Sequence, residues 1–310
     1  MIRLGDLLSA SFGWLLRWRE LLRWGDRPWT EGAEPAAPPS EGALRVMTFN
    51  VRGSHHRDGE NAWRHRAPLN VRTVARQGPD LIGLQEFQDG NARFYGRELA
   101  GYKGVLGHRY ENRPPHAHNA IYWDPGRLEM QDAGGFWLSE TPGRFSGSWE
   151  TRQIRSANWV RFRPVSGGPE FLHLNTHLDH ISDRARVEGS KLLLSWLDGP
   201  EADGAPVLLT GDFNCEPRSK ARDVFERAGF VDAHLAAGRE PAKTFHAFRG
   251  EGFRGRDPSK EHRIDWVLLR DGSRGERWSV KDYSIVRDAE PPLYPSDHYP
   301  VVADLSLETP

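Results

Sequence analysis

Cysteine is almost absent from this chain of 310 residues. Cys215 is the only one, so the chain cannot form an internal disulfide or a zinc site built on several thiolates. Cys215 follows the run GDFN (211–214), but no CxxC or CG signature supports a role as a nucleophile. We therefore predict that it is a small, partly buried packing residue.

The sequence also lacks an excess of either charge. The 42 Lys and Arg residues are balanced by 43 Asp and Glu residues, which gives a formal net charge of −1. Such a chain has no overall basic field that would draw it onto nucleic acid or anionic lipid. Any phosphate must therefore be captured by local groups. Arginine, which greatly outnumbers lysine here, makes forked contacts with phosphate.

No apolar run is long enough to cross a bilayer. The stretch LGDLLSASFGWLLRWRELLRWG (4–25) has leucine and tryptophan at helical spacing, but its longest apolar-leaning run is about ten residues. We predict an amphipathic helix at 1–24 and a linker rich in Pro, Gly, Glu and Ala at 25–43. The helix suits a membrane interface, and it suits docking on the domain or on another subunit equally well. We expect a cytoplasmic protein, free or peripheral to a membrane, and the N-terminus leaves secretion through a signal peptide open.

From residue 44 to residue 307, short apolar runs alternate with helical stretches. Helices are predicted at 67–78, 91–101, 182–197 and 219–229. Strands are predicted at 44–51, 80–86, 119–124, 158–162, 171–177, 206–212, 263–269 and 300–305. This mixture predicts one α/β domain at 44–307, a four-layer α/β/β/α sandwich of two packed mixed sheets with flanking helices.

Polar side chains gather at the ends of these apolar strands. Charge at a buried strand end is costly unless something pairs with it, so we expect these groups to surround a cation and an anionic substrate. Carboxylate and amide oxygens without thiolate suit Mg²⁺ or Mn²⁺, which polarise phosphoryl oxygens. The residues concerned are Asn50, Glu86, His177, Asp212, Asn214, Asp265, Asp297 and His298.

Six short motifs follow one another along the chain, and each is weak when taken alone. They are TFN (48–50), LQE (84–86), NTH (175–177), GDFN (211–214), RID (263–265) and SDHYP (296–300). In this order they resemble the endonuclease/exonuclease/phosphatase superfamily, which includes deoxyribonucleases, sphingomyelinases, inositol polyphosphate phosphatases and deadenylases. The resemblance covers about residues 44 to 307. The stretches GENAWRHR (59–66), NTHLDH (175–180) and TFHAFRG (244–250) look like bacterial members near the deadenylase-like branch.

The resemblance implies a metal site and a catalytic group. Glu86 is implied as the main metal ligand, with Asn50 beside it and Asp297 as a second carboxylate. Asp212 is implied to orient and deprotonate the attacking water, and Asn214 to hold that water or the phosphate.

Three further residues receive roles from the same resemblance. His298 is implied to contact the scissile phosphate, and Asp265 to hold its other ring nitrogen, which would fix the tautomer and favour the protonated ring. His177 is implied as another phosphate contact or a proton donor. The residues themselves leave structural alternatives open, such as a pair between Asp265 and Arg263.

Arg52 departs from the pattern of the superfamily. Some nuclease members carry an acid at this position, so the resemblance does not extend to a second metal beside Asn50. Arg52 either meets the substrate phosphate or is a solvated surface residue. Further candidates for substrate contacts are Asn119 and Arg155, at the starts of middle strands, and Asp179 and His180, for which roles in the core or in loops are equally open.

The sequence therefore predicts a phosphoric ester hydrolase that depends on Mg²⁺ or Mn²⁺. Water activated by Asp212 would attack a phosphodiester or phosphomonoester of a small metabolite or a lipid head group. The alternative is an endo- or exonuclease acting on DNA or RNA, although the near-zero net charge disfavours avid binding of duplex DNA. The presence of Glu86, Asp212 and His298 disfavours a non-catalytic scaffold, and the oxygen-rich ligand set disfavours a hydrolase of non-phosphate esters. Nothing in the sequence indicates an obligate protein partner.

Overall fold

The computed structural model describes residues 34–109, 117–255, 257 and 259–309, and it contains two β-sheets of six strands each. The first sheet has the strand order β11-β12-β1-β2-β4-β3. Its strands are β1 (Leu44–Asn50), β2 (Leu81–Gln88), β3 (Lys103–Leu106), β4 (Ala117–Trp123), β11 (Arg277–Ile285) and β12 (Val301–Glu308).

The second sheet has the order β5-β6-β7-β8-β10-β9. Both sheets are mixed, because β1 pairs in parallel with β2, and β7 with β8, while the remaining pairs are antiparallel. The strands of the second sheet are β5 (Leu128–Trp137), β6 (Ser156–Pro164), β7 (Phe171–His177), β8 (Val207–Asp212), β9 (Val231–Asp232) and β10 (Asp265–Arg270).

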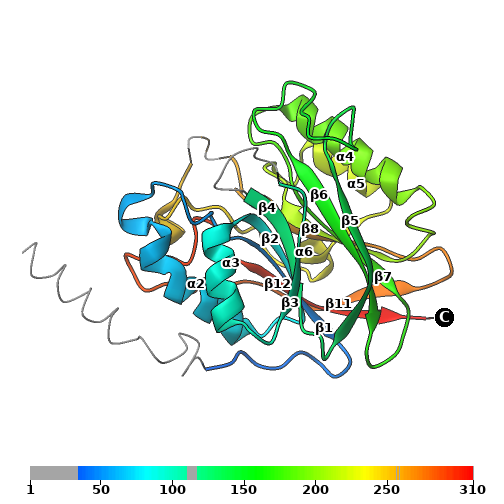
Figure 1. Ribbon diagram of the computed structural model, residues 1–310, viewed down its shortest axis with the longest axis horizontal. Coiled ribbons are helices and arrows are strands. Elements are labelled where there is room, and N and C mark those ends of the chain that lie inside the picture. Colours follow the sequence, from blue (N-terminus) through cyan, green and yellow to red (C-terminus); the bar gives the residue numbers. More distant parts are fainter. Residues whose placement is uncertain (1–33, 110–116, 256, 258, 310) are drawn as a thin grey trace, which may run out of the picture.

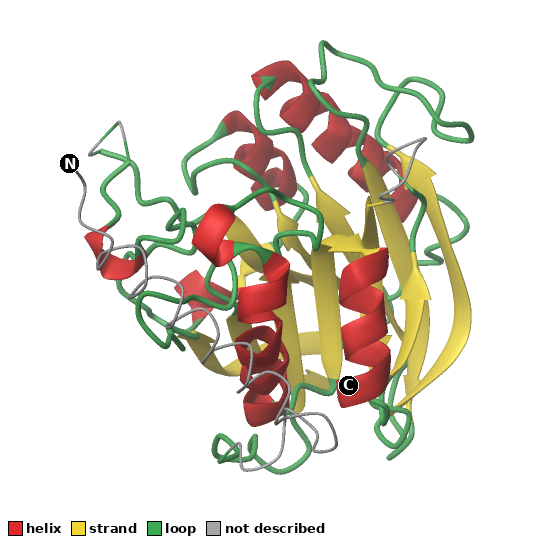
Figure 2. Cartoon of the chain, turned by 60° about the vertical axis from the view of Figure 1, so that its left-hand side comes forward, coloured by secondary structure: helices red, strands yellow, loops and turns green. Residues whose placement is uncertain are grey.

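Helices cover the outer face of each sheet (Figure 1). The first sheet carries α2 (Trp63–Gln77) and α3 (Asp89–Glu98), and the second carries α4 (Asp183–Leu197) and α5 (Lys220–Arg227). Three short helical segments complete the described chain, η1 (Gly59–Asn61), α6 (Ala233–Ala236) and η2 (Gly250–Gly252). The predicted four-layer sandwich is confirmed, and Figure 2 shows its sheets and helices from a second direction.

Alternation along the strands divides the core between the layers. In β1, Val46 faces the second sheet in the central core, whereas Met47 and Phe49 pack under α2 with Ala67 and Val71. Successive side chains of a strand point to opposite faces, so one apolar strand can serve two cores. This arrangement explains why the inner strands appear in the sequence as nearly continuous apolar runs.

A polar layer crosses the central core just below the strand ends. Asn175 Nδ2 donates to the carbonyl oxygens of Leu84, at 2.8 Å, and Ala120, at 3.0 Å, and Gln85 Nε2 donates to Asn175 Oδ1 at 2.7 Å. Thr210 Oγ1 lies 2.8 Å from His173 Nε2. Because a buried polar group is costly when unpaired, these bonds favour one register of the first sheet on the second.

The strand register brings the predicted site residues to one edge. His177 is the partner of Asp212 in the parallel β7–β8 pair, and Asp212 is the partner of Asp265 in the antiparallel β8–β10 pair. In the first sheet, Asn50 at the end of β1 lies opposite Gln85, next to Glu86. The ends of five core strands therefore converge near one point above the polar layer.

The structure contains four strands that the sequence analysis did not predict, β3, β5, β9 and β11. The long ones, β5 and β11, are edge strands with largely exposed or half-exposed residues, so they lack the apolar runs used to find the others. Helix α2 begins four residues before the predicted 67–78, because its first turn buries Trp63 and Arg66. The other predicted helices lie within a few residues of their observed bounds.

Residues 1–24, predicted as an amphipathic helix, lie outside the described part of the chain. Three residues of the predicted linker bond to the domain: Ala36 N donates to Arg76 O at 2.7 Å, Ala37 O accepts from Arg45 Nη1 at 2.7 Å, and Ala43 O accepts from Arg127 Nη2 at 2.7 Å. Among the helices that the structure describes, none combines the length and the apolar character needed to cross a membrane.

The polar layer yields a test with a matched control, because Asn175 and Asn158 are register partners on β7 and β6 and both are buried. Asn175→Ala removes the donor from two buried carbonyls and should lower the free energy of unfolding by roughly 1–3 kcal/mol. The side-chain amide of Asn158 has no hydrogen-bond partner among the described residues, so Asn158→Ala should cost less. Urea unfolding of both variants measures the difference, and equal costs would contradict the role assigned to the layer.

Candidate active site

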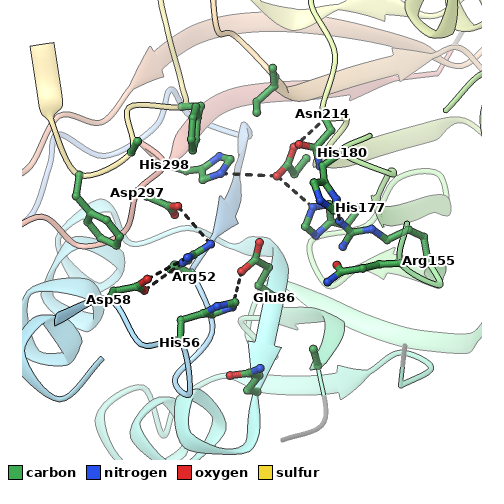
Figure 3. Close-up of a pocket in the computed structure, with 18 residues that line it drawn as sticks. Arg52, His56, Asp58, Glu86, Arg155, His177, His180, Asn214, Asp297 and His298 are labelled. Atoms are coloured by element: carbon green, nitrogen blue, oxygen red, sulfur yellow. Dashed lines mark hydrogen bonds and ion pairs between the residues drawn. The ribbon is translucent and has the colours of Figure 1, made fainter. Parts of the chain in front are cut away.

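A cavity of about 510 Å³ opens where the strand ends meet (Figure 3). Its lining comes from both sheets and includes Glu86 of β2, His177 of β7 and Asp212 of β8. Asp297 and His298, in the loop before β12, line it as well. The structure thus brings together residues that are up to 246 positions apart in the sequence, from Arg52 to His298.

The carboxylate of Glu86 reaches the cavity through an irregularity in β2. The pairing of β2 with β4 shifts register between Leu84 and Phe87, and Glu86 has a φ of 55°. A residue other than glycine in this conformation costs about 1–3 kcal/mol, and such bulges redirect side chains near functional sites. Burial alone would raise the pKa of Glu86, but a hydrogen bond from His56 and the positive charge of Arg52 hold it well below its usual value.

Asp212 is the most enclosed carboxylate of the cavity lining, with 1% of its surface exposed. Its Oδ2 accepts from Asn50 Nδ2 at 2.9 Å, and its Oδ1 accepts from the backbone amide of Asn214 at 2.9 Å. Burial raises the pKa of Asp212 to about 7, and Asp265 adds to this, whereas His298 opposes it. A carboxyl group in this state is suited to take up a proton near neutral pH.

Two histidines face Asp212. His177 Nε2 lies 3.3 Å and His298 Nε2 3.7 Å from Asp212 Oδ2. Burial, followed by the charge of Arg155, holds the pKa of His177 well below its usual value, so that its ring is neutral at pH 7. His298, by contrast, is protonated, so the two rings differ in charge although both Nε2 atoms lie near Asp212 Oδ2.

His298 is held in the protonated form by Asp265. The ring Nδ1 lies 2.9 Å from Asp265 Oδ2, and both side chains are buried. Burial would lower the pKa of His298, but Asp265 and Asp212 raise it to about 10. At neutral pH the ring therefore presents an Nε2–H to the cavity. The alternative pair of Asp265 with Arg263 is absent from the described residues, since Arg263 Nη1 binds Asp232 Oδ2 at 3.0 Å.

Asn50 and Asn214 form hydrogen bonds to the site carboxylates, Asn50 through its side chain and Asn214 through its backbone amide. Asn50 Nδ2 lies 3.2 Å from Glu86 Oε1 as well as 2.9 Å from Asp212 Oδ2, so one amide bridges carboxylates of both sheets. Asn214 lines the cavity with a φ of 50°, and its Nδ2 donates to Leu178 O at 3.0 Å.

Arg52 and His56 of the lining lie beside two of the predicted metal ligands. Arg52 binds both oxygens of Asp58, at 3.0 and 3.1 Å, and its Nη1 lies 3.7 Å from Asp297 Oδ2. His56 Nε2 lies 3.0 Å from Glu86 Oε2. Burial opposes the charge of Arg52, but Asp58 and Asp297 more than compensate, so its pKa is raised.

His56 and Asp58, which lie between the TFN motif and the GENAWRHR stretch, line the cavity and were not predicted from the sequence. Their only signal is a loop dense in charged residues, HHRDGE (55–60), directly after a strand that carries a site residue. Phe245 and Phe248 also line the cavity and were not predicted, although both lie in the stretch TFHAFRG.

The four other predicted substrate contacts divide into two pairs. Arg155 and His180 line the cavity, with Arg155 Nη2 3.5 Å from His180 Nδ1. Asn119 and Asp179 do not line it. Asn119 is fully buried and donates from Nδ2 to Ser156 O at 2.6 Å, so it lies below the cavity rather than on its wall.

Two groups of side chains offer ligands for a cation. Ligand atoms of Asp212, Asp265 and His298 lie within 4.8 Å of one another, and this group combines carboxylate oxygens with an imidazole nitrogen. The predicted group of Asn50, Glu86 and Asp297 is rich in oxygen, and Arg52 and His56 already lie beside its carboxylates. The second group fits Mg²⁺ or Mn²⁺ better, because these ions prefer oxygen ligands.

Comparison with known protein families gives an independent view of this arrangement. The model of the Endonuclease/Exonuclease/phosphatase family matches residues 47–298, a span that runs from β1 to His298. The chain belongs to this family. The resemblance seen in the six motifs is thereby confirmed, and so is the prediction of a phosphoric ester hydrolase, the activity of this family.

Relatives of known structure share the whole fold. An endonuclease/exonuclease/phosphatase family protein from Bacteroides thetaiotaomicron is 28% identical with a TM-score of 0.75, over 87% of this chain and 98% of that one. A mannosyl-6-phosphatase from the same organism is 28% identical with a TM-score of 0.74, over 84% of this chain and 99% of that one.

Nocturnin from Drosophila melanogaster is 26% identical over 332 residues, 89% of this chain, which spans about half (48%) of that protein's length.

Cys215, beside the site, is a buried free cysteine. Burial raises the pKa of its thiol to about 12, so the thiolate is negligible at neutral pH. The thiol is therefore a packing group and not a nucleophile.

Asp179 gives a prediction for pH dependence. Its carboxylate accepts hydrogen bonds from the amides of residues 152, 153, 181 and 182, at 2.7–3.1 Å, and from Thr151 Oγ1 at 2.9 Å. Burial alone would raise the pKa of Asp179, but these bonds lower it to about 2.

Because the folded pKa of Asp179 is depressed, its contribution to stability is present above the usual Asp pKa of about 4 and is lost as the pH falls towards 2. Asp179→Asn should therefore lower the unfolding midpoint at pH 6 more than at pH 3. Thermal unfolding at both pH values, with the exposed Asp198→Asn as control, measures this. An equal effect of Asp179→Asn at both pH values would contradict it.

Proposed function

We propose that this protein is a divalent-metal-dependent phosphoesterase that hydrolyses a phosphate ester of a small phosphorylated molecule or a lipid head group. The observation that carries the proposal is the position of Asp212, buried at the cavity floor between neutral His177 and protonated His298. This set supplies a proton acceptor and a fixed positive charge on adjacent sides of one space.

In the proposed reaction, water attacks phosphorus, the bond from phosphorus to the ester oxygen breaks, and the ester oxygen leaves as the alcohol with a proton taken up from solvent. Asp212 takes the proton of the attacking water, and a pKa of about 7 suits this task. Asn50 and the amide of Asn214 hold the carboxylate in orientation through the bonds at 2.9 Å. The Nε2–H of His298 is directed at the charge that develops on the phosphoryl oxygens, and Asp265 keeps that proton in place.

A bound divalent ion would be held by Glu86, Asp297 and Asn50, and it would supply Lewis-acid polarisation of the phosphoryl group. Arg52 is placed to contact the substrate phosphate from the same side, since Asp58 fixes its guanidinium in a forked pair at the cavity wall. Arg155 and His180 would contact the substrate at the opposite rim.

The volume of the cavity and the net charge of the chain support a small substrate. A cavity of about 510 Å³ lies within the range of small-molecule sites. The net charge of −1 provides no field for a polyanion. Similarity to a mannosyl-6-phosphatase adds support for a phosphorylated sugar. Cleavage of DNA or RNA is the alternative.

The cellular location and the domain boundaries belong to this proposal as well. We propose a cytoplasmic protein with its catalytic unit at 44–307, in which residues 1–24 either contact a membrane peripherally or dock on the domain or on another subunit. A lipid head group would gain weight as the substrate if such contact brought the cavity to a membrane.

A substrate panel tests the proposal. The purified chain should release phosphate or p-nitrophenol from a sugar 6-phosphate, p-nitrophenyl phosphate or bis-p-nitrophenyl phosphate with Mg²⁺, and EDTA should abolish the reaction. Plasmid DNA, oligoadenylate and sphingomyelin vesicles complete the panel. Cleavage of a nucleic acid with no activity on the small esters would replace the proposal by the nuclease alternative.

Asp212→Asn and His298→Gln should each lower turnover roughly 10²-fold or more, because each removes a proton acceptor or a charge-stabilising group. The matched control is Asp80→Asn, which changes a buried carboxylate before β2, at the other end of that strand from Glu86. Asp80→Asn should leave turnover unchanged. Wild-type rates in the two site variants would overturn the assigned roles.

A further inference from the structure

Arg66 is a buried arginine of α2 whose guanidinium binds backbone instead of carboxylate. Its side chain is fully buried, and it forms no salt bridge among the described residues. Nη1 donates to Val51 O at 2.7 Å and to Pro295 O at 2.8 Å, Nε donates to Asn61 O at 2.9 Å, and Nη2 donates to Arg52 O. One side chain therefore binds four carbonyls.

These carbonyls belong to three separate segments around the cavity. Val51 and Arg52 follow β1, Asn61 ends η1, and Pro295 precedes the SDH motif that carries Asp297 and His298. Neither the loop at 51–58 nor the loop at 294–300 contains a regular helix or strand, although the second is paired with residues 244–247 through a bridge between Phe245 and His298. Arg66 is thus a direct link between the segment of Arg52 and the segment of Asp297.

Two further contacts strengthen the same link. Asn70, four residues after Arg66 and so on the same face of α2, donates from Nδ2 to Pro295 O at 3.1 Å. Ser296 Oγ donates to Asn50 O at 2.6 Å. The rings of Trp63 and Phe248 lie 5.0 and 5.8 Å from the Arg66 guanidinium carbon.

We propose that Arg66 is a positioning residue of the active site, which holds the loop of Arg52 and the loop of Asp297 and His298 at a fixed separation. It also places a buried positive charge behind the site carboxylates. Burial lowers the pKa of Arg66 to about 10, while Asp297, Asp58 and Glu86 act to raise it, so the group stays charged at neutral pH. This role accounts for the GENAWRHR stretch, which supplies the arginine, the aromatic ring of Trp63 and the carbonyl of Asn61.

Arg66→Lys is the sharpest test of this role. Lysine keeps the charge, but its donors radiate from a single nitrogen and cannot reproduce the planar fork that reaches four carbonyls. Misplacement of catalytic groups by about 1 Å can cost roughly 10²-fold, so kcat/KM should fall by roughly that factor. Arg45→Lys is the matched control, because Arg45 is a buried arginine at the opposite end of β1 that binds Asp304 at 2.8 Å and Ala37 O at 2.7 Å.

Hydrogen exchange gives a readout independent of catalysis. In Arg66→Lys, amides of 51–58 and 294–298 should exchange faster than in the wild type, whereas Arg45→Lys should leave both segments unchanged. The kinetic arm rests on the proposed function and the exchange arm does not. If the wild type were inactive on the whole panel, exchange alone would still decide the role of Arg66.

The proposal is overturned if folded Arg66→Lys keeps the kcat/KM of Arg45→Lys and shows no faster exchange in the two loops. If Arg66→Lys does not fold, Asn70→Ala takes its place, since it removes only the second bond to Pro295 O. Asn70→Ala should speed exchange at 294–298 and lower kcat/KM severalfold. Wild-type behaviour of Asn70→Ala in both measurements would then contradict the proposal.

Discussion

A carboxylate buried between two sheets must be paired, and the pairing of Asp212 is the interaction on which the site depends. Asp212 ends a central strand of the second sheet with 1% of its surface exposed. Its partners come from the first sheet through Asn50, from the neighbouring strand through His177, and from the loop before β12 through His298. An unpaired carboxylate in such a place costs several kcal/mol, so any packing of the two sheets that separated these groups would be disfavoured.

The remaining architecture keeps these partners in register. The polar layer of Gln85, Asn175 and Thr210 joins the sheets below the site, and Arg66 and Ser296 join the loops beside it. Both devices use buried hydrogen bonds, which have directional requirements that apolar contacts lack. Glu86 and Asn214 both have positive φ, which costs conformational energy. The hydrogen bonds that fix the surrounding segments keep both residues in this conformation.

The sequence made the centre of the site predictable and its rim difficult to predict. Asp212 and His177 end apolar strands, and Glu86 lies near the end of one. The apolar run that predicts each strand therefore also predicts where these side chains lie. His56, Asp58 and Arg66 are in a loop and a helix, where no local pattern indicates which side chains turn inward. Asn119 illustrates the reverse error, since it occupies a core strand near the predicted strand ends and yet points into the packing beneath the cavity. The edge strands β5 and β11 were missed for a related reason, because exposed strands have no apolar signature.

The most direct test of the central claim is a crystal structure of the protein with Mn²⁺ and inorganic phosphate, in which anomalous scattering locates the ion. The account predicts the ion at Glu86 and Asp297, with the phosphate in contact with His298 and within reach of Asp212. An ion bound between Asp212, Asp265 and His298, or a phosphate bound outside the cavity, would contradict the division between metal ligands and proton-transfer groups.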